Sequence, residues 1–154
     1  MNLLSLLKKL FFGGERISDS VGQRPFQTLP DLSYLDDADG RMAKLWSRVT
    51  LLMEEKRPWL DSEFCLGHLA QRLFCNRSFL SKTINLCSGH NFRWLVNYYR
   101  VAYAADLMRR DPRMKIEQVA DLSGFNTLPT FNAAFKIQMR QRPSEYLGKI
   151  RRGY

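Results

Sequence analysis

Residues 122–136, LSGFNTLPTFNAAFK, carry the signals of a tight turn between two helices. Gly124 can take the positive φ angle at which many helices end, and Phe125 can fill the gap between the two helices. Thr127 can cap the second helix, and Pro129 falls in the first turn of that helix, where a missing N–H costs nothing. The stretch therefore predicts a helix-turn-helix.

A second copy of this pattern lies about fifty residues earlier in the chain. A shift of that length aligns Leu66, Leu69, Ala70 and Asn76 with Ile116, Val119, Ala120 and Asn126, and one inserted residue then aligns Leu80 and Ile84 with Phe131 and Phe135. Two helix-turn-helix units are therefore predicted, at residues 62–89 and 115–139. Their second helices are expected to span about residues 77–88 and 128–138.

Helical patterns continue through the rest of the chain from residue 41 onward. Residues 41–57 carry an apolar stripe at spacings of three and four, and Pro58 ends it. Residues 91–110 contain neither Gly nor Pro and predict one linking helix of about 30 Å. A last helix is expected at about residues 143–151. The sequence thus predicts an all-α fold of about seven helices, with two helix-turn-helix subdomains built as homeodomain-like bundles and joined by the linking helix.

The first forty residues differ from the rest in composition. Much of this stretch is Gly, Ser, Pro and mixed charge, so we expect an N-terminal arm at residues 1–40 with little fixed structure. Residues 1–12, MNLLSLLKKLFF, could form a short amphipathic helix that docks weakly to a membrane or a protein. The folded domain is predicted to comprise residues 41–150.

Positive charge is concentrated in the predicted domain. Residues 41–154 hold 20 Lys and Arg against 9 Asp and Glu, whereas residues 1–40 hold four against six. An excess of this size favours a polyanionic partner, either nucleic acid or an anionic membrane surface. No apolar run approaches the ~20 residues that span a bilayer.

Neither catalysis nor metal binding has sequence support. The two histidines lack a Ser or Cys partner motif, and no Gly-rich phosphate loop precedes a helix. Cys65 and His68 have a metal-like spacing, but only His90 and two distant cysteines could complete a site, so buried thiols are the favoured interpretation. No catalytic residue, cofactor or metal is therefore expected. The three cysteines form no CxxC pair and no signal peptide is evident, which indicates a reduced cytoplasmic protein.

The second helix of each unit is the element that keeps a face for a partner. In the second unit its inner side comprises Leu128, Phe131, Ala134 and Phe135. In helix-turn-helix proteins such a helix enters the major groove of DNA, and a linking helix of ~30 Å would set two units about one DNA turn (~34 Å) apart. The alternative is an all-helical bundle in which the second helices simply pack.

These segments resemble, in order and spacing, the DNA-binding domain of the AraC/XylS family of transcription regulators over about residues 42–150. The most specific shared features are the G-F and F-x-x-x-F-K series at Gly124, Phe125, Phe131, Phe135 and Lys136, the P-S-E-Y at Pro143 to Tyr146, and the R-x-x-x-A at Arg100 and Ala104. The resemblance implies sequence-specific binding of double-stranded DNA in two successive major grooves, recruitment of RNA polymerase and no catalysis. It also implies a nucleoid-associated location. Most members add an effector-binding or dimerisation domain, for which forty residues are too few. The chain would therefore act alone, without a small-molecule effector, or form the output end of a longer protein.

The resemblance also implies two sets of DNA-contacting residues. Those expected at base edges are Ser78, Ser81, Lys82 and Asn85 in the first recognition helix, and Thr130 and Asn132 in the second. Those expected at phosphates or the groove edge are Arg77, Phe79 and Lys136. Arg93 and Arg142 are also expected at phosphates, because they lie near helix starts or exposed ends, where a cation can reach phosphate. A lysine can donate to guanine and an asparagine can pair with adenine, although each could instead touch only phosphate. For any one of the cations, a solvated side chain is the ordinary alternative.

This sequence departs from the family pattern at four positions. Phe74 and Arg140 stand where the family usually has glycine, so both turns need strain or a changed path. Pro129 and Ala133 stand where longer polar side chains are common, so the contacts left to this helix face are with thymine methyls and phosphates.

Arg100 is expected to brace the linking helix through an acidic partner or backbone carbonyls rather than to bind DNA.

A rival function is that of an adaptor, a basic helical bundle docked to a membrane or a protein through its N-terminal segment. Binding that weakens steeply with salt would favour DNA as the partner. Liposome flotation that disappears when residues 1–12 are deleted would favour the adaptor.

Overall fold

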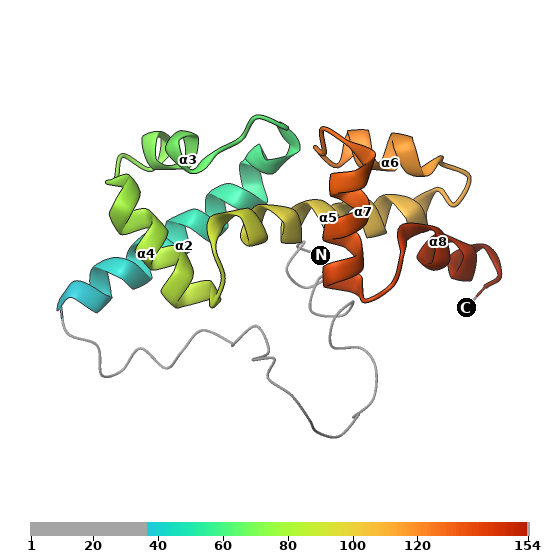
Figure 1. Ribbon diagram of the computed structural model, residues 1–154. Helices are drawn as coiled ribbons and strands as arrows, with labels where there is room; N and C mark the ends of the chain where they lie inside the picture. Colours follow the sequence, from blue (N-terminus) through green and yellow to red (C-terminus); the bar gives the residue numbers. More distant parts are fainter. Residues whose placement is uncertain (1–36, 154) are drawn as a thin grey trace, which may run out of the picture. The chain divides into compact units, whose positions relative to one another are not determined.

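The fold is helical throughout the described part of the chain. The computed structural model describes residues 37–153, which contain seven α-helices, one short 3-10 helix and no strand, and this confirms the all-α prediction. In chain order the elements are α2 (Asp37–Lys56), η1 (Pro58–Leu60), α3 (Leu66–Arg72), α4 (Arg77–Ser88), α5 (Phe92–Arg110), α6 (Ile116–Leu122), α7 (Leu128–Met139) and α8 (Pro143–Arg151) (Figure 1). None of these helices is both long and apolar enough to cross a membrane. The expectations for residues 1–12, and for most of the arm, lie outside the described residues.

The described chain divides into two compact units. The first comprises residues 37–57 and 65–92, which include α2, α3 and α4. The second comprises residues 58–64 and 93–153, which include η1, nearly all of α5, and α6 to α8. The 58–64 segment therefore belongs to the second unit, although in the sequence it lies between two helices of the first.

The first unit is built on the apolar side of α2. Leu45, Trp46, Val49 and Met53 recur at spacings of three and four, and all are buried. Both α2 and α3 pack against α4. Further buried side chains of this unit are Leu69 of α3, Leu73 directly after α3, and Leu80 and Ile84 of α4. The helical periodicity of the sequence thus corresponds to the buried side of α2.

The predicted end of α2 agrees with the structure, whereas the predicted start does not. The helix begins at Asp37, four residues before the predicted start at residue 41. A glycine costs an exposed helix only about 1 kcal/mol, so the exposed Gly40 does not delay its start. The helix ends at Lys56 as predicted, since Arg57 takes a positive φ of 47° and Pro58 follows.

The 58–64 segment is fixed to the second unit by Trp59 and Arg100. The Trp59 side chain is fully buried, with its ring 6.0 Å from that of Tyr99 and 5.5 Å from that of Tyr103. Arg100 Nε donates to the Trp59 carbonyl at 2.7 Å, and its Nη2 donates to the Asp61 carbonyl at 2.9 Å. The prediction that Arg100 braces its helix through backbone carbonyls is therefore confirmed.

The surroundings of Arg100 explain why an arginine suits this place. Burial lowers the pKa of the guanidinium, and the nearby Asp61 carboxylate opposes that effect by raising it. The guanidinium carbon also lies 5.6 Å from the centre of the Phe125 ring, within the range of a cation–π contact. A planar, permanently charged group can satisfy two carbonyls and an aromatic face at once.

Helix α3 begins at Leu66, four residues after the predicted start of the first helix-turn-helix at residue 62. The intervening residues are engaged elsewhere: Asp61 Oδ1 accepts from the Glu63 N–H at 2.9 Å, and the Asn126 side chain donates to Glu63 Oε1 at 3.2 Å. These contacts hold the segment in the second unit in a turn, so it does not extend α3.

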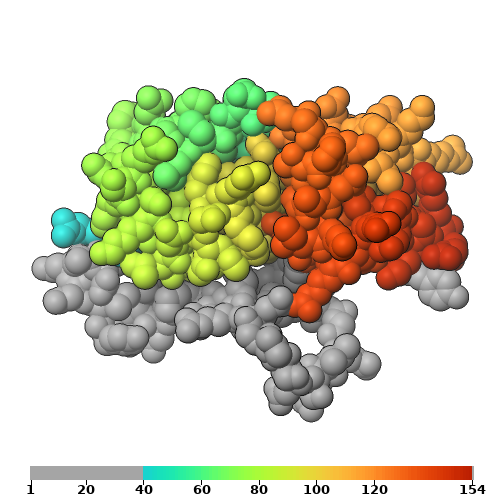
Figure 2. Space-filling view, viewed as in Figure 1, coloured from blue at the N-terminus to red at the C-terminus, as the bar shows by residue number. Residues whose placement is uncertain are grey.

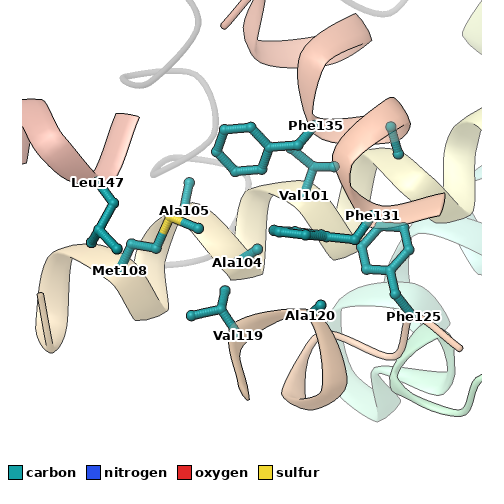
Figure 3. Close-up of a cluster of buried hydrophobic side chains, with 11 residues drawn as sticks. Val101, Ala104, Ala105, Met108, Val119, Ala120, Phe125, Phe131, Phe135 and Leu147 are labelled. Carbon is teal, nitrogen blue, oxygen red and sulfur yellow. The ribbon is translucent and has the colours of Figure 1, made fainter. Parts of the chain in front are cut away.

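The core of the second unit gathers side chains from four helices (Figure 3). They are Val101, Ala104, Ala105 and Met108 of α5, Val119 and Ala120 of α6, Phe131, Ala134 and Phe135 of α7, Leu147 of α8, and Phe125 from the turn between α6 and α7. The small alanines of α5 leave room for the aromatic rings of α7, which fill the space beside them in this close-packed core.

Gly124 brings the turn between α6 and α7 against the 58–64 segment. Its φ is +81°, which confirms the positive φ expected from the sequence. A Cβ at this position would lie 2.6 Å from the Trp59 carbonyl oxygen and 2.7 Å from that of Leu60. Only glycine fits here, both for its backbone angle and for the space.

Candidate nucleic-acid interface

Helix α4 is held at both ends by the residues that the sequence indicated. Asn76 Oδ1 accepts from the backbone N–H of Ser78 at 2.8 Å and from that of Phe79 at 3.2 Å. At the other end Gly89 has a φ of +73°, and its N–H donates to the Asn85 carbonyl at 3.0 Å. Side-chain capping and a left-handed terminal residue fix the helix within its unit.

The two sides of α4 differ in chemistry. The buried side comprises Leu80, Thr83, Ile84 and Ser88. The predicted contacts Arg77, Ser78, Lys82 and Asn85 are all exposed, whereas Ser81 and Phe79 are half-buried at the border between the two sides. The exposed side therefore offers two cations, a hydroxyl and an amide that can exchange hydrogen bonds with base edges.

Lys82 is available for an external partner. It lies near the middle of α4 and is exposed, and its side chain makes no hydrogen bond or ion pair with another residue in the described part of the chain. A lysine held by no internal partner can direct its ammonium group to a base or a phosphate.

The turn before α4 keeps the path of a glycine turn although Phe74 occupies it. Phe74 has a φ of +50°, and Arg140 after α7 has a φ of +54°, so both positions without the family glycine adopt the left-handed conformation. Of the two alternatives given for these turns, strain or a changed path, the structure has the strained one. The Phe74 side chain is 94% exposed, so no burial compensates for its backbone angle.

We predict that Phe74→Gly raises the free energy of unfolding by up to about 1 kcal/mol, because glycine adopts this φ without steric cost. Urea denaturation followed by circular dichroism measures the change. Phe74→Ala is the matched control, since it removes the same exposed ring and keeps the strained backbone. If the glycine variant is no more stable than the alanine variant, the turn is not strained.

Helix α7 begins with the cap and the proline expected from the sequence. Thr127 is the N-cap, its Oγ1 accepts from the Thr130 N–H at 3.4 Å, and the two threonine hydroxyls lie 2.8 Å apart. Pro129 lies in the first turn. The Thr130 hydroxyl, predicted at a base edge, is thus already engaged in the cap.

The buried side of α7 is aromatic. Phe131 packs edge-to-face against Phe125 at 5.2 Å and against Phe135 at 5.5 Å, and Phe135 meets Tyr146 at 5.6 Å. This row of rings anchors α7 from the turn before it to α8 after it, and Figure 3 shows the rings of Phe125, Phe131 and Phe135. The opposite side of the helix is left at the surface (Figure 2).

Predicted DNA contacts of the second unit come together around one surface hollow. This hollow of about 500 Å³ is lined by Asn132 and Lys136 of α7, by Arg142 and Ser144 at the start of α8, and by Ile116, Glu117, Leu128, Ala133 and Pro143. The backbone N–H of Arg142 is occupied by Glu145 Oε2 at 2.9 Å, so its side chain is the group that remains for a phosphate. Arg93, predicted at a phosphate as well, is exposed near the start of α5 and does not line the hollow.

The structure adds one residue that the sequence interpretation did not include. Ile137 of α7 is 70% exposed, on the same side as Ala133 one turn before it. The 3.6-residue period could have indicated it, because residues 129, 133 and 137 repeat at intervals of four.

A metal site is not formed within the described residues, where no three His, Cys, Asp or Glu side chains are grouped suitably.

Comparison with known proteins places these features in a family. Residues 69–149 match the family described as helix-turn-helix domain. Over 91 residues, 59% of this chain, the sequence is 37% identical to the TCP pilus virulence regulatory protein of Vibrio cholerae serotype O1, in each of two strains. That stretch is 30% of the relative, so the chain spans less than a third of its length.

Solved structures share the fold. The C-terminal domain of the two-component response regulator yesN from Fusobacterium nucleatum superposes with a TM-score of 0.58 at 21% identity, over 68% of this chain and 98% of that one. The C-terminal domain of AraT, a response regulator from Geobacillus stearothermophilus, gives a TM-score of 0.58 at 23% identity, over 76% and 88%. The family match covers more than half of the chain, and the two helix pairs and the motifs at Gly124, Phe131 and Pro143 agree with it. The chain therefore belongs to the helix-turn-helix domain family of the AraC/XylS type.

Proposed function

We propose that the protein is a sequence-specific, DNA-binding transcription regulator whose recognition helices are α4 and α7. The observation that carries this proposal is the same in both units. A second helix is buried on one side by its own unit, and its other side is exposed and carries polar groups and a lysine. Such a helix, in a family of DNA-binding domains, fits the major groove.

The proposed roles follow the chemistry of each side chain. Lys82 and Asn85 contact base edges from α4, with Ser78 and Ser81 beside them, and Asn132 does so from α7 with Thr130 in support. Arg77, Arg93, Lys136 and Arg142 contact phosphates, and Phe79 lies at the groove edge. Binding alone accounts for this function, so we assign the protein no catalysis and no cofactor.

The remaining parts of the proposal extend to the whole chain. Residues 41–150 would form the DNA-binding domain, the two recognition helices would occupy successive major grooves, and RNA polymerase would be the protein partner. A DNA-bound regulator would act at the nucleoid in the cytoplasm. The rival adaptor function depends on residues 1–12, which lie outside the described residues, and nothing in the described part favours it.

We predict that sites selected from a random duplex pool share a motif of two parts, and that Lys82→Ala and Asn132→Ala each relax the preference in a different part. Loss of one base contact should weaken binding to the selected site by about 1–3 kcal/mol. Fluorescence anisotropy with the selected duplex measures the affinity.

Lys44→Ala is the matched control for Lys82→Ala. It also removes one exposed lysine, but from α2, which is not a recognition helix. It should weaken binding to every sequence equally or not at all. The proposal fails if no motif is selected and binding only declines uniformly with salt, since the positive charge would then be a non-specific footprint.

A further inference from the structure

The exposed side of α7 has an apolar centre. Pro129, Ala133 and Ile137 follow one another at intervals of four, so they lie along one side of the helix, and all three are exposed. Phe131, Ala134 and Phe135 supply the buried side, so this row is not needed for the core. Asn132 and Lys136 lie beside the row, also exposed.

The corresponding row on α4 is different. With the alignment of the internal repeat, Pro129, Ala133 and Ile137 correspond to Ser78, Lys82 and Leu86. Leu86 is 63% exposed, so both helices present an aliphatic side chain at the third position of the row. At the first two positions α4 has a hydroxyl and an ammonium group, whereas α7 has only hydrocarbon.

Only one feature of the major groove matches a hydrocarbon row. Each base pair presents hydrogen-bonding groups there, and thymine adds a C5-methyl group, which is the apolar feature of the groove. The flanking side chains fit the same ligand, because the Asn132 amide can pair with adenine and the cations Lys136 and Arg142 line the hollow beside it. An apolar row with a cationic border suits duplex DNA better than an apolar protein surface.

We infer that α7 recognises thymine C5-methyl groups through Pro129 and Ala133, with Ile137 extending the contact. The part of the binding site that α7 reads is accordingly rich in T·A pairs, and the part that α4 reads is specified by hydrogen bonds. This inference depends on the proposed function and assigns a specificity to its second recognition helix.

Replacement of single thymines by deoxyuridine tests the inference directly. The exchange removes only the methyl group and keeps every hydrogen-bonding group of the base pair. In the selected duplex, each thymine is replaced in turn and the dissociation constant is measured by fluorescence anisotropy. We expect about a fourfold loss of affinity at each contacted thymine, as for one buried methyl group.

Variants of α7 identify the side chain that contacts the methyl group. For each contacted thymine, the uracil duplex and the thymine duplex are compared with the variants Ala133→Ser and Pro129→Ser. The ratio of their two dissociation constants should fall toward one in the variant that has lost the methyl contact. Leu122→Ala is the matched control, since Leu122 is an apolar residue of α6 that is 52% exposed. The ratio of dissociation constants measured with this variant should equal that of the unaltered chain.

Each outcome has a distinct meaning. If the chain binds its selected site but no uracil replacement weakens binding, or if the loss persists in both serine variants, α7 does not read methyl groups and the inference is wrong. If no site can be selected at all, the proposed function fails first, and the inference fails with it. Circular dichroism spectra of the variants exclude loss of folding as the cause.

Discussion

Arg100→Met should lower the free energy of unfolding by about 3–5 kcal/mol. The guanidinium donates to the carbonyls of Trp59 and Asp61, and a hydrogen bond from a charged group contributes about 1.5–3 kcal/mol. Methionine keeps the bulk of the side chain but donates no hydrogen bond, so both carbonyls lose their charged partner. Urea denaturation followed by circular dichroism measures the loss.

Two further variants separate the causes. Arg93→Met removes an exposed arginine from the same helix and should change stability by less than about 0.5 kcal/mol. Arg100→Lys keeps the charge, but one ammonium group cannot reproduce the fork of two donors, so an intermediate loss is expected. An Arg100→Met variant as stable as Arg93→Met would mean that the two hydrogen bonds do not hold the 58–64 segment.

The second large effect is expected for Gly124→Ala, with a loss of about 2–4 kcal/mol. A left-handed φ costs a non-glycine residue about 1 kcal/mol or more. In addition, the new Cβ would lie 2.6 Å from the Trp59 carbonyl oxygen and 2.7 Å from that of Leu60. Backbone atoms cannot rotate away as a side chain can, so the 58–64 segment must move, and overpacking typically costs 1–3 kcal/mol.

Gly89→Ala provides the control for the backbone angle alone. Gly89 has a similar φ of +73°, and a Cβ there would meet nothing within 4 Å. Its substitution should therefore cost only the conformational part, about 1 kcal/mol, in the same urea denaturation experiment. Equal losses for the two alanine variants would show that the close approach at Gly124 carries no energy.

The helix-turn-helix units could be predicted because their signals are local. Asn76, Gly89, Thr127 and Pro129 act on residues within the same turn or the next, and each acts in the structure as the sequence indicated. The exposure of Lys82 also follows from helical period alone.

The placement of the 58–64 segment could not be predicted, because its partners are distant in sequence. Trp59 and Arg100 are 41 residues apart, and no pattern within a helix-sized window connects them. The contrast between α4 and α7 was partly visible in Pro129 and Ala133. Ile137 falls at the next position of the same helical period, and the structure shows that its side chain is 70% exposed.

The mixed order of the two units along the chain has a consequence for protein synthesis. Residues 58–64 leave the ribosome before residues 65–92, whereas the residues that they contact, on α5 and at Gly124, are synthesised after both. During synthesis of residues 65–92, the indole of Trp59 therefore lacks both its stacked partner Tyr99 and its edge-on partner Tyr103. A chain truncated between residues 64 and 93 would therefore keep Trp59 but lack Tyr99, Arg100 and Tyr103, the residues of α5 that contact it.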